Sequence, residues 1–183
     1  MTSPSRLKVE TTRLTLVAGT LEHVRAELGS AANLAVLLDV EVPSGWPPGE
    51  YDRDAQQFFQ DRLKEGGAAV VGWNVWYAIL RATGKSPATL VASGGFLAPP
   101  DEAGVTETGF SVVADYRGHG YATEMVKALT LWAFTDHRVN TIIAHTSTHN
   151  IASRNVLDRT GFHLIGHEVE NLRYELRRPG VPP

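Results

Sequence analysis

The heptapeptide RGHGYAT, residues 117–123, lies between a predicted strand and the clearest predicted helix of the chain. Glycine at positions 118 and 120 permits positive φ angles and removes the Cβ atoms that would keep a ligand away from the backbone. Unpaired amides and the helix dipole converge where such a helix begins, so this segment predicts a phosphate site. The same two glycines also fit a tight turn without a ligand, and both interpretations stay open at this point.

Two common phosphate-binding motifs do not fit the segment. The P-loop pattern G-x-x-x-x-G-K-S/T is absent, which argues against a nucleoside triphosphatase. A dinucleotide fingerprint requires Gly or Ala where Thr123 stands, and an acidic residue after the next strand, which ends instead in His145 and Thr146. A dinucleotide-dependent dehydrogenase is therefore also disfavoured.

Strand and helix patterns continue on both sides of the heptapeptide. In chain order they predict strand 13–17, helices 20–28, 31–38 and 52–66, strands 73–82, 89–96 and 106–113, helix 121–133, strand 141–146, helix 151–160, and strands 162–168 and 173–177. The Pro-rich loop 40–49 around Trp46 fits either a surface connection or a wall of a substrate site. The order predicts an α/β fold with a mixed sheet, helices on both faces, and one parallel strand pair flanking the long helix.

Composition predicts a single soluble globular domain, because 183 residues lie within the range of about 100–200 residues per domain. We expect a flexible N-terminal tail at 1–10, the domain at 11–178, and a C-terminal tail at 179–183. The net charge of -3 lacks the basic surplus typical of nucleic-acid binding, and no apolar run suits a membrane span or a secretory signal. With no cysteine there is no thiolate metal ligand, so we expect a cytoplasmic protein without a metal.

Two segments together resemble a known family. The pattern R/Q-x-x-G-x-G/A falls on Arg117, Gly120 and Ala122. Residues 150–162, NIASRNVLDRTGF, are similar to the pattern N-x-x-S-x-x-V/L-L-x-R/K-x-G-F, and they follow the first segment after the expected helix and strand. Both patterns, in this order, resemble the GCN5-related N-acetyltransferases (GNAT), most closely the branch with the ribosomal-protein alanine acetyltransferases. The resemblance covers residues 11–178 in element order.

The resemblance implies a binding mode for acetyl-coenzyme A. The pyrophosphate would sit on the amides of residues 118–123, and pantetheine would run between the splayed parallel strands 106–113 and 141–146. In the family the first strand has a bulge, which frees backbone groups near Val112 and Val113 for the pantetheine amides. The coenzyme-binding residues implied in this way are Val112, Val113, Arg117, Gly118, His119, Gly120, Tyr121, Ala122, Thr123, Asn150 and Asn155.

Acetyl transfer to an amine requires a base, because free amines are mostly protonated at neutral pH. Glu107 is one candidate, since the segment ETGF at 107–110 resembles an acidic context of this family branch, and His145 is the second. Asn150 resembles a residue that contacts pantetheine or a catalytic water, and as an alternative it caps a helix. Leu157 stands where many family members have a Tyr acid, so Ser153 is the nearest hydroxyl for the leaving thiolate.

The function predicted in this way is acetyl transfer from acetyl-coenzyme A to a primary amine of a small molecule or a protein N-terminus, by direct attack in a ternary complex. The alternative is a non-catalytic acyl-coenzyme A sensor or interaction module. Loops 40–50, 97–105 and 166–172 are expected to select the acceptor. Neither nucleic acid nor membrane is an expected partner, and the chain is expected to be a monomer or a homodimer.

Overall fold

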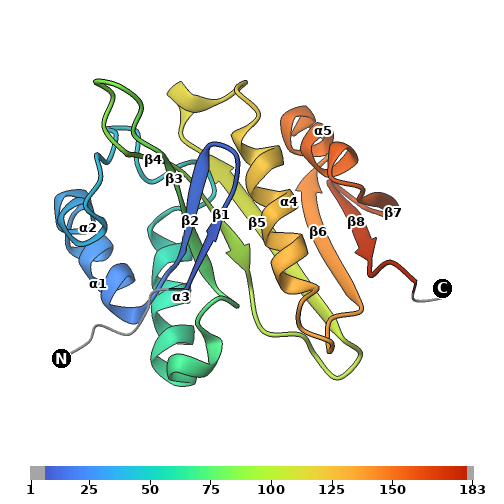
Figure 1. Cartoon of the computed structure of the whole chain (residues 1–183). Coiled ribbons are helices and arrows are strands. Elements are labelled where there is room, and N and C mark those ends of the chain that lie inside the picture. Colours follow the sequence, from blue (N-terminus) through green and yellow to red (C-terminus); the bar gives the residue numbers. More distant parts are fainter. Residues whose placement is uncertain (1–6, 181–183) are drawn as a thin grey trace.

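The computed structural model describes residues 7–180, and within this range the strands form one eight-stranded sheet in the order β1-β2-β3-β4-β5-β6-β8-β7 (Figure 1). The strands are β1 (Lys8–Glu10), β2 (Leu14–Ala18), β3 (Val75–Leu80), β4 (Thr89–Phe96), β5 (Val105–Val112), β6 (Thr141–Ser147), β7 (His163–Glu168) and β8 (Asn171–Arg177). The α-helices are α1 (Leu21–Gly29), α2 (Ala31–Leu38), α3 (Arg53–Gly66), α4 (Tyr121–Ala133) and α5 (Ile151–Arg159), with short 3-10 turns at Gly67–Val70 and Ala114–Tyr116.

Helices cover both faces of the sheet, because alternate strand residues point to opposite sides. Leu16 and Trp76 belong to the core that α4 and α5 cover. Their chain neighbours Val17 and Tyr77 belong to the core that α1, α2 and α3 cover on the other face (Figure 1). The mixed α/β fold with helices on both faces is therefore confirmed. No helix between residues 7 and 180 is long and apolar enough to cross a membrane.

The sheet opens between β5 and β6, its one parallel pair among the described strands. These strands pair only at Val105–Glu107 with Thr141–Ile143. Beyond that point β5 pairs with β4 from Thr108 to Val112, and β6 continues along β8 to Ser147. The facing edges of β5 and β6 thus leave the ladder where α4 crosses over, which confirms the splayed parallel pair.

The first strand was not predicted. Lys8–Glu10 fall within the stretch 1–10 that sequence analysis assigned to a flexible tail, yet they pair antiparallel with β2. Three residues are too short for a periodic pattern, and the strand forms because a tight turn closes between Thr11 and Leu14. Residues 1–6 and 181–183, the remaining parts of the two expected tails, lie outside the described residues.

The bulge expected in the strand 106–113 is not found there. The pairing of β4 with β5 runs without a shift from Thr108 to Val112. The register shift occurs instead between β3 and β4, where Ala78 pairs with Ala92 but Ile79 pairs with Leu90. The carbonyl oxygen of the extra residue, Val91, accepts a hydrogen bond from the N–H of Val113 (2.9 Å). The backbone groups facing the opening are therefore freed by the divergence of β5 from β6.

Candidate active site

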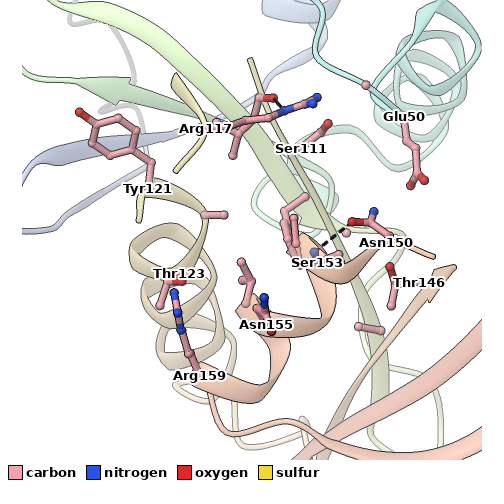
Figure 2. Close-up of a pocket in the computed structure, with 18 of the residues that line it drawn as sticks. Glu50, Ser111, Arg117, Tyr121, Thr123, Thr146, Asn150, Ser153, Asn155 and Arg159 are labelled. Carbon is pink, nitrogen blue, oxygen red and sulfur yellow. Dashed lines mark hydrogen bonds between the residues drawn. The ribbon is translucent and has the colours of Figure 1, made fainter. Parts of the chain in front are cut away.

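A cleft of about 570 Å³ lies between the start of α4, the free edge of β5 and the first turns of α5 (Figure 2). It brings together the segments 117–123 and 150–162, which residues 124–149 separate in the chain. The residues labelled in Figure 2 surround it from β5, β6, α4, α5 and the loops before α3 and α4: Ser111, Arg117, Tyr121, Thr123, Thr146, Asn150, Ser153, Asn155, Arg159 and Glu50.

The loop before α4 forms an anion cradle. Gly118 and Gly120 have φ angles of +79° and +81°, which L side chains rarely adopt, and a Cβ at Gly118 would meet only open space. Gly120 is the N-cap of α4 and supplies no side-chain cap. The first backbone hydrogen bond of the helix runs from the N–H of Glu124 to the carbonyl of Gly120. The N–H groups of Tyr121 to Thr123 come before it and therefore have no partner within the helix. Uncapped amides beside open space fit a phosphate.

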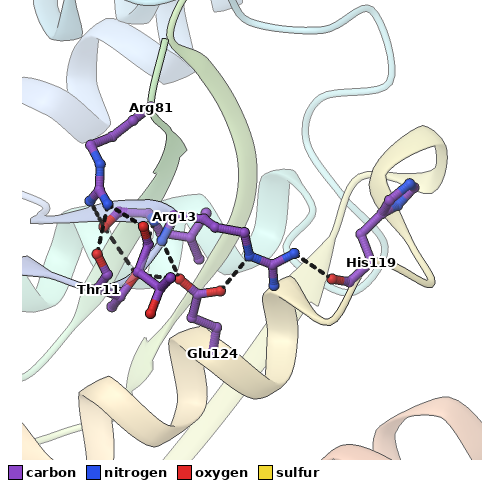
Figure 3. Close-up of polar contacts among 7 residues, drawn as sticks. Thr11, Arg13, Arg81, His119 and Glu124 are labelled. Carbon is purple, nitrogen blue, oxygen red and sulfur yellow. Dashed lines mark hydrogen bonds and ion pairs between the residues drawn. The ribbon is translucent and has the colours of Figure 1, made fainter. Parts of the chain in front are cut away.

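A hairpin from the other end of the chain holds this loop in place (Figure 3). The Arg13 guanidinium lies 2.8 Å from a Glu124 carboxylate oxygen, donates to the carbonyl of His119 (2.8 Å), and stacks 4.6 Å from the centre of the Tyr121 ring. Thr11 donates its hydroxyl to Glu124 at 2.6 Å. Burial favours a higher pKa for Glu124, but the hydrogen bonds from Thr11 and Arg13 outweigh it and hold the pKa below its ordinary value.

The start of α5 supplies the opposite wall. Asn150 is the N-cap of this helix, and its Oδ1 accepts the N–H of Ser153 at 3.0 Å. Asn150 also lines the cleft, so both roles considered for it are compatible. Ser153 and Asn155 face the cleft as well, and Arg159 adds a cation near Thr123 (Figure 2). Leu157 is fully buried in the core and lines neither pocket of the site.

A second pocket of about 370 Å³ lies on the face of the sheet that α3 covers. Tyr51, Ala55 and Phe59 form one side of it, and Glu107 projects into it from β5. The two pockets share residues at the opening between β5 and β6: Glu50, Thr108, Gly109, Phe110, Ser111, His145 and Thr146. The two pockets therefore meet through the opened sheet.

The two candidate bases are partners. Nδ1 of His145 lies 2.8 Å from Oε1 of Glu107, and both side chains are about one-third exposed (32% and 30%). Both project from the odd-numbered side of their strands, which faces the second pocket. The two residues were predicted as alternative bases, and in the structure they form a hydrogen-bonded pair.

A buried carboxylate fixes the loop between α2 and α3, which borders both pockets. Glu27 of α1 accepts hydrogen bonds from the Trp46 indole (2.7 Å), the Tyr51 and Tyr77 hydroxyls (2.7 Å each) and the Gln56 amide (3.0 Å). Burial raises the pKa of Glu27, although these four hydrogen bonds oppose the shift. Trp46 is thus anchored in the core, and the same loop carries residues 49 and 50 to the site.

Some predicted residues lie elsewhere. Val113 is fully buried, its N–H is bonded to Val91, and it does not line the cleft. Nδ1 of His119 lies 2.9 Å from the Arg117 carbonyl, and His119 does not line the cleft either. Each of the three loops expected to select the acceptor contributes to the second pocket. Glu50 comes from loop 40–50, Leu97 from loop 97–105 and Asn171 from region 166–172.

Four residues of this arrangement were not predicted from the sequence. Arg13 and Glu124 brace the loop before α4, Glu50 lies where the pockets meet, and Arg159 lines the larger cleft. Arg159 falls on the R/K position of the second motif, which was the available signal. Between residues 7 and 180, no three His, Asp or Glu side chains gather into a group that could hold a metal ion.

The chain is similar to known acetyltransferases. The chain matches the family model described as an acetyltransferase (GNAT) domain over residues 13–163. It is 28% identical over 137 residues to the uncharacterized N-acetyltransferase YjdG of Bacillus subtilis, a match that covers 75% of this chain and 77% of that protein.

Solved structures share the fold. A structure of RimL, a ribosomal L7/L12 alpha-N-protein acetyltransferase in complex with coenzyme A, matches with a TM-score of 0.66 and 16% identity, covering 93% of this chain and 98% of that chain. The microcin C7 self-immunity acetyltransferase MccE, in complex with acetyl-CoA and AMP, matches with a TM-score of 0.63 and 14% identity, covering 96% and 98%.

The fold has a cleft beside an opened parallel strand pair, and the matching family model is that of an acetyltransferase domain. The chain belongs to the GNAT family, since the family model spans most of its length. It is an acetyltransferase with acetyl-coenzyme A as its cosubstrate. The family resemblance drawn from residues 117–123 and 150–162 is confirmed.

Proposed function

We propose that the enzyme transfers the acetyl group directly from acetyl-coenzyme A to a primary amine while both are bound. The observation that carries this proposal is the meeting of the two pockets at the opening between β5 and β6. An amine bound in one pocket reaches a thioester bound in the other without a relay. The sequence also contains no cysteine that could carry the acetyl group in between.

The larger cleft suits the coenzyme. The pyrophosphate would accept from the amides of residues 118–123, with Arg117 and Arg159 as cations nearby. Arg117 is itself oriented, since its Nε donates to the Val112 carbonyl at 3.1 Å. Pantetheine would follow the free edge of β5, and Asn155 and Asn150 would face it from α5. Val113 is left out of this set because its backbone groups are already bonded.

The Glu107–His145 pair would accept the amine proton. When His145 donates its Nδ1 proton to Glu107, its Nε2 carries the lone pair that a base needs. The amine nitrogen then forms a bond to the thioester carbon, the proton moves to the base, and the carbon–sulfur bond breaks. Ser153 would donate a hydrogen bond to the departing thiolate or order a water that protonates it. A thiol with a reference pKa of about 8.5 needs little more help.

The direct test measures coenzyme A release with a panel of small amines, polyamines and N-terminal peptides, beside calorimetric binding of acetyl-coenzyme A. Turnover with members of the panel supports the proposal. Tight coenzyme binding without turnover for every amine would favour the alternative, a non-catalytic acyl-coenzyme A sensor. The expected cytoplasmic location and the monomeric or homodimeric state remain predictions.

A further inference from the structure

The two pockets of the site carry opposite charges. The coenzyme cleft is lined by Arg117 and Arg159, which match the phosphates of the donor. The second pocket is lined by the carboxylates of Glu50 and Glu107, and no Lys or Arg is among the described residues around it. The ion preference therefore changes from anion to cation across the opening in the sheet.

Glu50 is the carboxylate that is available to a substrate. Its side chain lines both pockets and points toward Asn150 and Thr146 at their junction (Figure 2). Within residues 7–180 it makes no hydrogen bond or ion pair, whereas Glu107 is already bonded to His145. An exposed carboxylate at the point where the amine must approach the thioester attracts the protonated form of that amine.

The wall of the second pocket on the side of α3 is largely apolar. Tyr51, Ala55 and Phe59 line it there, and Leu97 adds an exposed aliphatic side chain. Tyr51 does not offer its hydroxyl to the pocket, because that hydroxyl is bonded to the buried Glu27. This wall accommodates a ring or an aliphatic chain, and among the described residues it contains no Lys or Arg that would pair with an anion.

We infer that the acceptor is a small primary amine with an aromatic or aliphatic body and no carboxylate beside the amine, and that Glu50 binds its ammonium group. This inference rests on the proposed function. A free amino acid would bring its own carboxylate toward Glu50 and Glu107, where like charges repel. Glu50 thus selects the acceptor, while the Glu107–His145 pair removes its proton.

The experiment compares two acceptors that differ in one group, L-phenylalaninamide and L-phenylalanine. We expect kcat/KM to be at least tenfold higher for the amide. Glu50→Gln keeps the shape and removes the charge, so it should raise KM for the amide about tenfold, leave kcat within about threefold, and narrow the gap between the two acceptors. Glu102→Gln is the control, since this exposed carboxylate lines neither pocket.

Binding of both acceptors to the coenzyme A-bound protein gives a second measure that needs no turnover. Preference for the amide that shrinks in Glu50→Gln supports the inference. Equal use or equal binding of the free amino acid would overturn it, as would a Glu50→Gln enzyme with unchanged discrimination. Absence of turnover with every acceptor would contradict the proposed function, and the binding preference would still decide the acceptor class.

Discussion

At the scale of single residues, the positive φ of Gly120 makes the loop before α4 sensitive to substitution, and a Cβ there would lie 3.5 Å from Nη2 of Arg13. Gly120→Glu introduces a side chain and a negative charge where the pyrophosphate is proposed to bind, so acetyl-coenzyme A affinity should fall at least a hundredfold. Calorimetric titration of the folded variant measures the loss. The control is Gly84→Glu, because Gly84 also has a positive φ (+57°) but lies in the turn between β3 and β4 and lines neither pocket. Unchanged affinity in Gly120→Glu would refute the loop assignment.

The Glu107–His145 hydrogen bond predicts that the two side chains act as one unit. Glu107→Gln and His145→Gln should each lower kcat by about 10²–10⁴-fold, the usual contribution of a general base. The double variant should then be little worse than the more damaged single variant, because the second substitution acts on a pair already broken. Dissociation constants for acetyl-coenzyme A should stay within about threefold. Fully additive losses would show that the two residues act independently.

Glu27 predicts a pH-dependent stability. Burial raises the pKa of Glu27 in the folded state above its ordinary value of 4.5. The contribution of Glu27 to the free energy of unfolding is therefore fully present below pH 4.5 and is lost as the pH rises through the folded-state pKa. Glu27→Gln does not titrate and leaves buried donors poorly matched, which should cost about 1–3 kcal/mol near neutral pH. Urea unfolding across the acidic range should therefore show the gap between wild type and variant narrowing as pH rises. A widening gap would mean that the ionised form is favoured in the folded state.

At the scale of elements, the N-terminal hairpin is predicted to support coenzyme binding through Arg13. Arg13→Ala removes the bonds to Glu124 and the His119 carbonyl, so KM for acetyl-coenzyme A should rise about tenfold. S-acetylpantetheine lacks the pyrophosphate, and its kcat/KM should be unaffected by the substitution. Arg13→Lys should recover part of the affinity. An equal loss with both donors would show that Arg13 supports the whole domain instead of the loop.

The elements show which contacts a sequence reveals. The loop 117–123 and the start of α5 were predicted, because turn glycines, an N-cap and helical periodicity act over a few residues. The contact from Arg13 to Glu124 spans 111 positions, and the one from Tyr77 to Glu27 spans 50. Such contacts depend on strand order, which local patterns do not specify. Glu50 was missed for the same reason, since only the folded loop brings it to the opening.

At the scale of the whole molecule, the opened sheet joins a cationic cleft to an acidic pocket, and direct transfer at their junction is the central claim. Initial rates measured over a matrix of acetyl-coenzyme A and L-phenylalaninamide concentrations test it most directly. A ternary complex predicts double-reciprocal lines that intersect, because both substrates must be bound before either product leaves. Parallel lines would instead indicate an acetylated enzyme intermediate, and they would contradict the account.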